Sequence, residues 1–293
     1  MPTASIRARS PRIVQSRQNA RVKELRAGFA RSPGTEHGHI AIEGEHLLLE
    51  AIATQLHISA VFIRAGSESL SARGSSVSAR AVSLLDRLHL HESTEIITLP
   101  PDVFSSAVST ESPQGIAALI EPPAFTLDQI LAAPATPLIL IAAGLQDPGN
   151  LGTLIRTAEA FAATGLITLS GTVSPWNQKA LRASAGSVFR LPVVAADEAE
   201  IFPALESRGI TTLAAVAPGV PLEGQPLTQR DLTRPTALIL GNEGSGIPPE
   251  ILRRATARVT IPTPGPVESL NAAIAGSILL YEASRQRSAI MSS

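Results

Sequence analysis

One stretch of the chain decides the fold class: Leu138-Ile-Leu-Ile-Ala-Ala-Gly-Leu-Gln-Asp-Pro-Gly-Asn-Leu-Gly-Thr-Leu-Ile-Arg156. Its apolar run, Leu138–Ala143, has the length of a buried strand, and Asp147-Pro148-Gly149 is a turn-forming sequence. The residues that follow show the periodicity of a helix over Leu151–Ala163. A buried strand that turns directly into a helix is the start of a strand–helix–strand unit, so we expect a mostly parallel sheet.

The same alternation continues along the rest of the chain. Strands are predicted at Leu138–Ala143, Leu166–Leu169, Val188–Val194, Thr211–Val216, Ala237–Leu240 and Arg258–Ile261. Helices are predicted at Leu151–Ala163, Asn177–Ala185, Glu198–Arg208, Pro249–Arg254 and Leu270–Arg287. We therefore expect an α/β domain over residues 138–288, with helices on both faces of its sheet.

Residues 1–120 have a different pattern and are predicted to form a separate α/β domain. Its expected helices are Asn19–Phe29 and His46–Thr54, and its expected strands are Ile40–Ile42, Val61–Arg64, Glu95–Leu99 and Ile116–Ile120. Residues 1–11 are expected to be disordered, and the Ser- and Arg-rich stretch Ala65–Arg80 is expected to be a loop. The proline-containing segment 121–137 is expected to be a linker with a short helix at Leu127–Leu131.

Composition excludes several classes of function. The chain has 293 residues, of which 44% are hydrophobic but only 3% aromatic, so its cores must consist of aliphatic side chains. The absence of cysteine excludes disulfides, thiolate metal sites and a cysteine nucleophile. The six histidines show no ligand spacing tied to a motif, so no metal is expected. No apolar run reaches about 18 residues, so we expect no membrane span and a cytoplasmic location.

The net charge is −1, but basic residues gather at the N-terminal end. Residues 1–31 contain one acid, Glu24, and the basic residues Arg7, Arg9, Arg12, Arg17, Arg21, Lys23, Arg26 and Arg31. A basic end on a nearly neutral protein indicates contact with a polyanion at that end. A solvated, partly disordered tail accounts for the charge equally well.

Three glycine-bearing or polar turns follow predicted strands, the positions at which open α/β sheets bind ligands. The first contains Asn150, Gly152 and Arg156. Asn150 is a good N-cap for the helix, Gly152 permits close approach of another backbone or a ligand, and Arg156 lies off the buried helix face. Taken alone, this pattern is more often an ordinary helix start with a solvated arginine.

The second turn is Gly241-Asn-Glu-Gly-Ser-Gly246, whose glycines expose backbone N–H groups to a ligand. Its spacing is not that of a dinucleotide fingerprint or a P-loop, so a phosphate cradle is not indicated. Glu243 is suited to bond a ribose hydroxyl or an amino group, although a surface turn with a solvated acid is the simpler alternative. The third turn places Ser269, Leu270 and Asn271 at the start of a small-residue helix, a type that is often buried against another subunit.

Taken together, these motifs resemble the three signature motifs of the SpoU family of RNA ribose 2′-O-methyltransferases, which belong to the knotted methyltransferases. Ser184–Arg190 is also similar to a segment of that family. Ile42–Leu48 resembles its N-terminal substrate-binding domain, whose fold is like that of an RNA-binding ribosomal protein. The resemblance covers residues 12–287.

The resemblance implies a deep trefoil knot in the C-terminal part of the catalytic domain, S-adenosylmethionine as cofactor, and a homodimer formed through this domain. The residues that it assigns to the cofactor are Leu240, Gly241, Gly246, Ile261 and Leu270. The residues that it assigns to catalysis are Arg156, Glu243, Ser269, Asn271 and Asn150. It gives Arg156 the role of activating the hydroxyl; since a guanidinium stays protonated in proteins, a clamp on the neighbouring phosphate that stabilises the developing alkoxide is the alternative to a general base.

The resemblance implies an RNA substrate, and the two-domain architecture favours 23S ribosomal RNA. Transfer RNA is the alternative substrate, and a catalytically inactive RNA-binding homologue is the alternative function. A dinucleotide-dependent oxidoreductase is disfavoured because no G-x-G-x-x-G follows the first strand of either domain.

Overall fold

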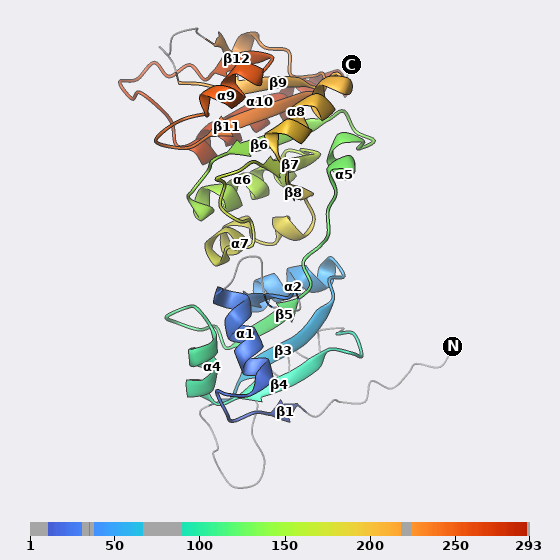
Figure 1. The fold of residues 1–293 in the computed structure, drawn as a ribbon, viewed down its shortest axis with the longest axis vertical. Coiled ribbons are helices and arrows are strands. Elements are labelled where there is room, and N and C mark those ends of the chain that lie inside the picture. The colour runs from blue at the N-terminus through green and yellow to red at the C-terminus, as the bar shows by residue number, and fades with distance from the viewer. Residues whose placement is uncertain (1–10, 31–34, 36–37, 67–89, 218–223, 292–293) are drawn as a thin grey trace, which may run out of the picture. The chain divides into compact units, whose positions relative to one another are not determined.

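The computed structural model describes residues 11–30, 35, 38–66, 90–217 and 224–291. These residues divide into two compact units, Met1–Pro123 and Ala124–Ser293 (Figure 1). Residues 1–10 of the segment predicted to be disordered, and most of the loop predicted at Ala65–Arg80, lie outside the described residues.

The first unit is built on a mixed sheet with the strand order β1-β4-β3-β5-β2. Its strands are β1 (Arg12–Ile13), β2 (Ile40–Glu43), β3 (Ile58–Arg64), β4 (Glu95–Leu99) and β5 (Ile116–Ile120). Its helices are α1 (Ala20–Ala30), α2 (Glu45–Ala53) and α4 (Pro101–Ala107). β5 runs antiparallel to both β3 and β2, whereas β1, β4 and β3 are parallel.

Alternate residues of this sheet face a single core under α1 and α4. Leu25 of α1 and Phe104 of α4 pack there against Phe62 of β3, and all three are fully buried. Because side chains alternate along a strand, their neighbours Val61 and Ile63 face the opposite side, and these are also fully buried. Both faces of the central strand are therefore covered, which accounts for its nearly continuous apolar sequence.

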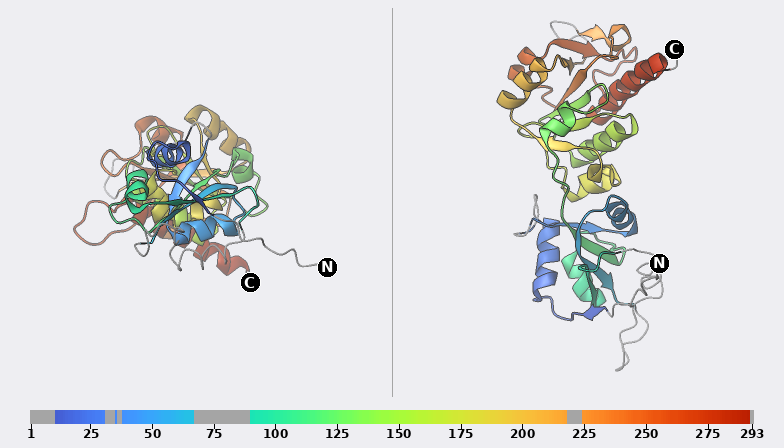
Figure 2. Two further views of the ribbon diagram at one scale, coloured as in Figure 1. Left: turned by 90° about the horizontal axis from the view of Figure 1, so that it is seen from below. Right: turned by 90° about the vertical axis from the view of Figure 1, so that its right-hand side faces the viewer.

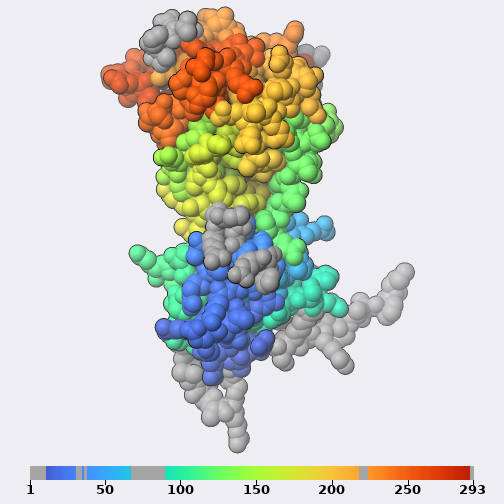
Figure 3. Space-filling view, in the orientation of Figure 1, coloured from blue at the N-terminus to red at the C-terminus, as the bar shows by residue number. Residues whose placement is uncertain are grey.

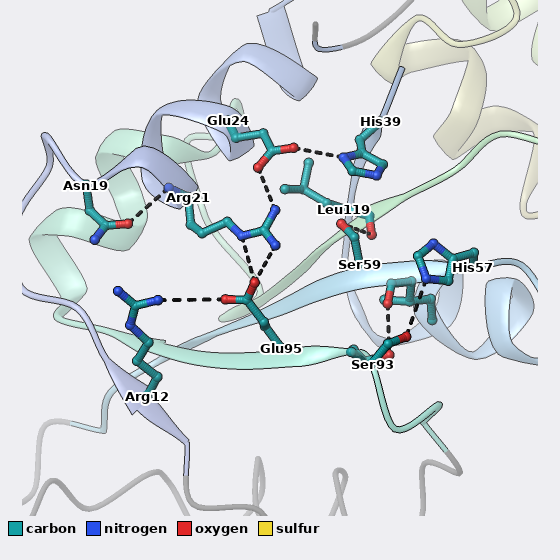
Figure 4. A network of polar contacts seen from close by, with 12 residues as sticks. Arg12, Asn19, Arg21, Glu24, His39, His57, Ser59, Ser93, Glu95 and Leu119 are labelled. Atoms are coloured by element: carbon teal, nitrogen blue, oxygen red, sulfur yellow. Dashed lines mark hydrogen bonds and ion pairs between the residues drawn. The ribbon is translucent and has the colours of Figure 1, made fainter. Parts of the chain in front are cut away.

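A network of charged side chains ties α1 to β4 of this sheet (Figure 4). Arg21 donates through Nε to Glu95 Oε1 at 3.0 Å and through a terminal nitrogen to Glu24 at 2.8 Å. Glu24 also contacts His39 Nδ1 at 2.8 Å. Burial alone raises the pKa of Glu24, but the hydrogen bonds from His39 and Arg21 outweigh it and lower the pKa overall.

The same network bears on the expected polyanion contact at the N-terminal end. Arg12 lies 3.9 Å from Glu95, Arg17 pairs with Asp102 at 2.9 Å, and Arg21 is paired as described above. Acids from the same unit therefore neutralise much of the described part of the basic run. Arg7, Arg9 and Arg31 lie outside the described residues.

The second unit is an α/β domain with a parallel sheet in the order β10-β12-β9-β11-β6-β7-β8. Its strands are β6 (Leu138–Ala143), β7 (Gly165–Thr168), β8 (Val193–Ala195), β9 (Thr211–Ala215), β10 (Gln225–Pro226), β11 (Thr236–Gly241) and β12 (Ala257–Thr260). Its helices are α5 (Leu127–Leu131), α6 (Pro148–Ala160), α7 (Gln178–Ser184), α8 (Glu198–Ser207), α9 (Pro249–Arg254) and α10 (Ala272–Met291). The predicted α/β class with a mostly parallel sheet is confirmed.

Helices cover both faces of the second sheet (Figure 2). Ile139 and Ile141 of β6 face a core cluster that includes α5, α8 and α9, and atoms of α8 and α9 form the outer surface on this side in Figure 3. On the opposite face, α6 packs against both α7 and α10. Gly276 of α10 lies close to Leu154 of α6 and Leu240 of β11, since a Cβ at Gly276 would come within 2.5 Å of both side chains.

Several features differ from the sequence predictions, among them the following three. The strand predicted at Val188–Val194 is wrong over most of its length, because Gly186 has φ +90° and Ser187–Phe189 forms a 3-10 turn, leaving β8 to begin at Val193. The short helix α4 was not predicted, since its sequence is rich in serine and starts on two prolines. The second half of segment 121–137, predicted to be a linker, packs onto the second unit, because Ile130 and Leu131 of α5 are buried in the core of that unit.

No described helix combines the length and the apolar character needed to cross a membrane.

Candidate active site

The loops that follow three strands of the second sheet converge at one edge. β6, β11 and β12 are parallel, so their carboxyl ends lie on the same side of the sheet. The loop after β6 leads into α6, the loop after β11 holds Gly241–Gly246, and the loop after β12 leads into α10. This is the edge at which parallel α/β sheets bind their ligands.

Side chains from all three loops meet in one hydrogen-bonded chain. Asn150 Nδ2 donates to Glu243 Oε1 at 2.6 Å, and Asn271 Nδ2 donates to Asn150 Oδ1 at 3.2 Å. Asn271 is held in turn, because its Oδ1 accepts from the backbone N–H groups of Ala273 and Ile274 at the start of α10. Three of the five predicted catalytic residues are therefore in direct contact. Glu243 and Asn271 lie 93 and 121 positions after Asn150 in the sequence.

The start of α6 differs from the prediction. The helix begins at Pro148, and its N-cap is Asp147, whose Oδ1 accepts from the Asn150 backbone N–H at 2.9 Å. The interpretation of Asn150 as the N-cap is thus wrong. The turn before Pro148 supplies a better-placed acceptor, which leaves the Asn150 side chain free to join Glu243 and Asn271.

Asp147 is fixed from its other side by α7. Lys179 Nζ donates to Asp147 Oδ2 at 2.8 Å, and this hydrogen bond, followed by the one from the Asn150 N–H, lowers the pKa of Asp147. Sequence reasoning missed both residues as parts of the site. An aspartate three residues before Asn150 and next to a proline at the first helical position was the available signal for Asp147.

A cavity of about 410 Å³ lies beside the Glu243 loop. Its lining includes all five residues predicted to contact the cofactor, together with two of those predicted to be catalytic: Leu240, Gly241, Glu243, Gly246, Ile261, Ser269 and Leu270. Further apolar walls come from Val216, Val259 and Ala275. The volume falls within the range of about 300–1,000 Å³ that is usual for small-molecule sites.

The Gly241–Gly246 loop is shaped by a close crossing of its own backbone. A Cβ on Gly241 would lie 2.3 Å from the carbonyl carbon of Gly246 and from the nitrogen of Ile247, so only glycine fits. Asn242 and Gly246 exchange two backbone hydrogen bonds at 2.9 Å. Asn242 Nδ2 also donates to Gly144 O at 3.0 Å, which fastens the loop to the end of β6. Sequence reasoning did not single out Asn242.

Arg156 lies apart from the hydrogen-bonded chain. It is exposed on α6, does not line the cavity, and within the described part of the chain forms no hydrogen bond or ion pair. Gly152, one turn earlier on the same helix face, lies against the backbone of α7, where a Cβ would come 2.4 Å from Ala180 O. The predicted close approach at Gly152 is therefore made to another helix, and Arg156 is left available to a ligand.

A second hollow lies between α6 and α10, next to the same asparagines. Its lining includes Asn150, Asn271, Ile274 and Tyr281. Tyr281 stacks edge-on against Phe161, with the ring centroids 5.8 Å apart. Ile274 and Tyr281 are 53% and 55% exposed, so α10 is not buried on all sides within one chain.

Comparison with known proteins places both units. The SpoU rRNA Methylase family matches residues 137–281, and the MRM3-like substrate binding domain matches residues 19–118. The chain is 31% identical over 269 residues to the 23S rRNA (guanosine(2553)-2′-O)-methyltransferase RlmP of Bacillus subtilis, covering 92% of this chain and 97% of the relative. It is 34% identical over 197 residues to the 23S rRNA (uridine(2479)-2′-O)-methyltransferase of Streptomyces viridochromogenes, covering 66% and 68%.

The structure is similar to that of the SpoU methyltransferase AviRb from Streptomyces viridochromogenes in complex with AdoMet. The TM-score is 0.76 at 28% identity, and the match covers 92% of this chain and 98% of AviRb. Identity over nearly the full length of the Bacillus relative, with the converging motifs described above, establishes the relationship. The chain is a member of the SpoU rRNA methylase family with an N-terminal MRM3-like substrate-binding domain.

Proposed function

We propose that this protein transfers a methyl group from S-adenosylmethionine to a ribose 2′-hydroxyl of ribosomal RNA, with 23S rRNA as the substrate class. One observation carries the proposal: Glu243 belongs both to the wall of the cavity and to the hydrogen-bonded chain with Asn150 and Asn271. A small-molecule site and a polar cluster suited to a ribose therefore share a wall. Related chains named as 23S rRNA 2′-O-methyltransferases favour that substrate over transfer RNA.

The cavity residues fit this cofactor by their chemistry. Leu240, Ile261 and Leu270 offer apolar surface for an adenine ring, and the Gly241–Gly246 loop offers backbone donors and acceptors without side chains in the way. Gly246 has φ +73° and open space where a Cβ would be. The bound cofactor supplies an electrophilic methyl group on a sulfonium centre.

The residues of this chain would position and polarise the nucleophile. In the transfer, a bond would form between the 2′-oxygen and the methyl carbon as the carbon–sulfur bond breaks; the sulfur would leave as a neutral thioether, and the hydroxyl proton would pass to solvent water. Asn150 has both ends of its amide engaged and so holds the Glu243 carboxylate in one orientation. Glu243, Ser269 and Asn271 would then orient the hydroxyl and the cofactor in line, which is the main requirement of such a displacement.

Arg156 is assigned to the RNA side of the reaction. Its guanidinium is exposed and unpaired within the described residues. A permanent cation of this kind is suited to hold the phosphate next to the target ribose and to stabilise the oxygen as its proton leaves.

The same proposal covers domain roles, chain topology and assembly. Residues 1–120 would bind RNA, residues 121–137 would link the domains, and residues 138–288 would carry the chemistry. The position of β11 between β6 and β9, followed by the return of α10 onto α6, supports a knotted path. The exposed Ile274 and Tyr281 beside the α6–α10 hollow support a homodimer through this face.

The test is single-turnover methylation of 23S rRNA fragments by Arg156→Ala and Arg156→Lys, with cofactor affinity measured in parallel. We expect a loss of roughly 100-fold or more in rate for Arg156→Ala, as for removal of an electrostatic transition-state contact, with cofactor affinity unchanged. Wild-type rates in both variants would overturn the role of Arg156. Failure of the wild-type protein both to bind the cofactor and to methylate RNA would instead favour the inactive RNA-binding homologue.

A further inference from the structure

The outer face of α7 carries two cations, Lys179 and Arg182, of which only Lys179 has a role described above, as the partner of Asp147. Ala180, Leu181 and Ser184 are buried, whereas Lys179 and Arg182 are exposed. Residues three apart on a helix lie on the same side, so the two basic side chains are neighbours on the outer surface of α7.

This face adjoins the active site. Gly149 and Gly152 of α6 both lie against α7, since a Cβ on Gly149 would be 3.0 Å from Lys179 Cε and one on Gly152 would be 2.7 Å from Ala183 Cβ. Arg156 follows Gly152 by four residues and therefore lies on the side of α6 that meets α7. The outer face of α7 at Lys179 consequently adjoins the start of α6, because Lys179 bonds Asp147, which in turn accepts from the Asn150 N–H.

Acids balance only part of the charge of this face, through the pairing of Lys179 with Asp147. Arg182 and Arg156 form no ion pair with any described residue. The acids close by are already engaged: Asp147 with Lys179, Glu159 with Arg190, and Glu243 with Asn150. The surface is therefore net positive and complementary to a polyanion.

The only tryptophan of the chain, Trp176, lies at the start of this face. It is partly exposed, and it immediately precedes Asn177, the N-cap of α7. The loop that carries it is held to the end of β6, because Val173 N donates to Leu145 O at 2.8 Å and Gly144 N donates to Thr172 Oγ1 at 3.0 Å. A partly exposed indole on a fixed loop beside the cations Lys179 and Arg182 has the elements of a stacking platform for a nucleic-acid base.

We propose that Trp176, Lys179 and Arg182, which we term the α7 surface, bind an unpaired segment of the substrate RNA adjoining the target nucleotide. Lys179 and Arg182 contact its phosphates, and the indole stacks on one base. This inference rests on the proposed function and narrows its substrate to RNA that is single-stranded next to the methylated ribose, because a base can stack on a side chain only when it has left the helical stack.

The probe is a ten-nucleotide pyrimidine RNA, compared with a duplex of equal length, titrated into the full chain at low salt. Because Trp176 is the sole tryptophan, its emission reports this surface directly, and we expect the single strand to quench it more strongly than the duplex. Arg182→Ala should weaken binding about fivefold and flatten the salt dependence by about 0.7 in log–log slope. Trp176→Ala, followed by anisotropy of labelled RNA, should weaken binding roughly 5- to 150-fold, as for the loss of one base stack.

Arg253→Ala is the matched control, because Arg253 is an exposed arginine on α9 and forms no ion pair with any described residue. Arg253→Ala should leave the affinity for RNA unchanged. A Trp176→Phe variant retains an aromatic ring and part of the stacking, so it separates loss of the ring from loss of the fold. The proposal is overturned if RNA leaves the emission of the wild-type protein unaltered and if Arg182→Ala and Trp176→Ala bind RNA with wild-type affinity. Quenching by an acidic peptide but not by RNA would also overturn it.

The two proposals fail in different ways. If the wild-type protein methylates RNA while the α7 variants bind it normally, only the α7 surface is refuted. If RNA quenches Trp176 but no methyl group is transferred, the proposed function fails instead.

Discussion

The crossing of the chain at Gly241 gives a quantitative prediction about the cofactor cavity. A Cβ at this position would meet backbone atoms of Gly246 and Ile247 at 2.3 Å, whereas ordinary van der Waals contact begins at 3.4 Å. The loop must therefore move by about 1.1 Å, the difference of the two values, to admit Gly241→Ala. Because the obstructing atoms are backbone, no side chain can rotate away to relieve the contact.

A shift of this kind is an overpacking change, which typically costs about 1–3 kcal/mol. If the loop is forced away from its position in the cavity wall, that cost corresponds to cofactor binding roughly 5- to 150-fold weaker. The matched control is Gly244→Ala in the same loop, where the nearest atom to a Cβ is Asn242 Oδ1 at 3.5 Å and φ is not positive.

The assay is calorimetric titration of each purified variant with S-adenosylmethionine, with a thermal melt of the same samples. We expect Gly241→Ala to lose affinity and Gly244→Ala to retain it. Equal, near-wild-type affinity in both variants would refute the argument that the Gly241 crossing shapes the cofactor site. Equal losses in both would show that any side chain in the loop is harmful and that the crossing is not the cause.

Three further predictions concern packing and charge. Gly152→Ala should lower the melting temperature more than Gly276→Ala. A Cβ at residue 152 would meet backbone atoms and a Cβ of α7, whereas one at residue 276 would meet the ends of flexible leucine side chains. The reverse order of melting temperatures would contradict this reasoning. Asp147→Ala should cost about 1 kcal/mol of stability, measured in melts, and should slow methyl transfer in single-turnover assays by loosening Asn150. Asp147→Asn keeps a cap acceptor and should recover most of the lost stability and rate. No difference between the two variants would exclude a capping role. Because Glu24 has a lowered pKa in the folded state, its contribution to stability is present above its unfolded pKa of about 4.3 and disappears as the pH falls through the lower folded value. Melts of Glu24→Gln and wild type should therefore differ most above about pH 5, and the difference should shrink as the pH falls below the unfolded pKa. A difference that does not change with pH would show that ionisation is not involved.

The strand–helix alternation of the second unit could be predicted because its signals are local. Leu138–Ala143 is apolar throughout and is buried on both faces, as a central parallel strand requires. Val188–Val194 is apolar at every position but Arg190, yet the positive φ of Gly186 starts a 3-10 turn that places Val188 and Phe189 in the core without a strand. Local hydrophobicity cannot distinguish these two outcomes.

The site was predictable as a set of residues but not as a geometry. The motifs identified Asn150, Glu243 and Asn271, but nothing in their spacing showed that one asparagine side chain would join the other two residues. That contact depends on the order of the strands and on the capping of α6 by Asp147, and both are long-range properties of the folded chain. Lys179 belongs to a different helix, so its contact with Asp147 could not be read from either local sequence.

The most direct test of the account is to incubate unmodified 23S rRNA with the purified protein and S-adenosylmethionine and to map the methylated nucleotides by mass spectrometry of nuclease digests. We expect a methyl group on the 2′-oxygen of a single ribose, and we expect it to be lost in Arg156→Ala. A methyl group on a base, or no transfer by a protein that binds both RNA and cofactor, would contradict the account.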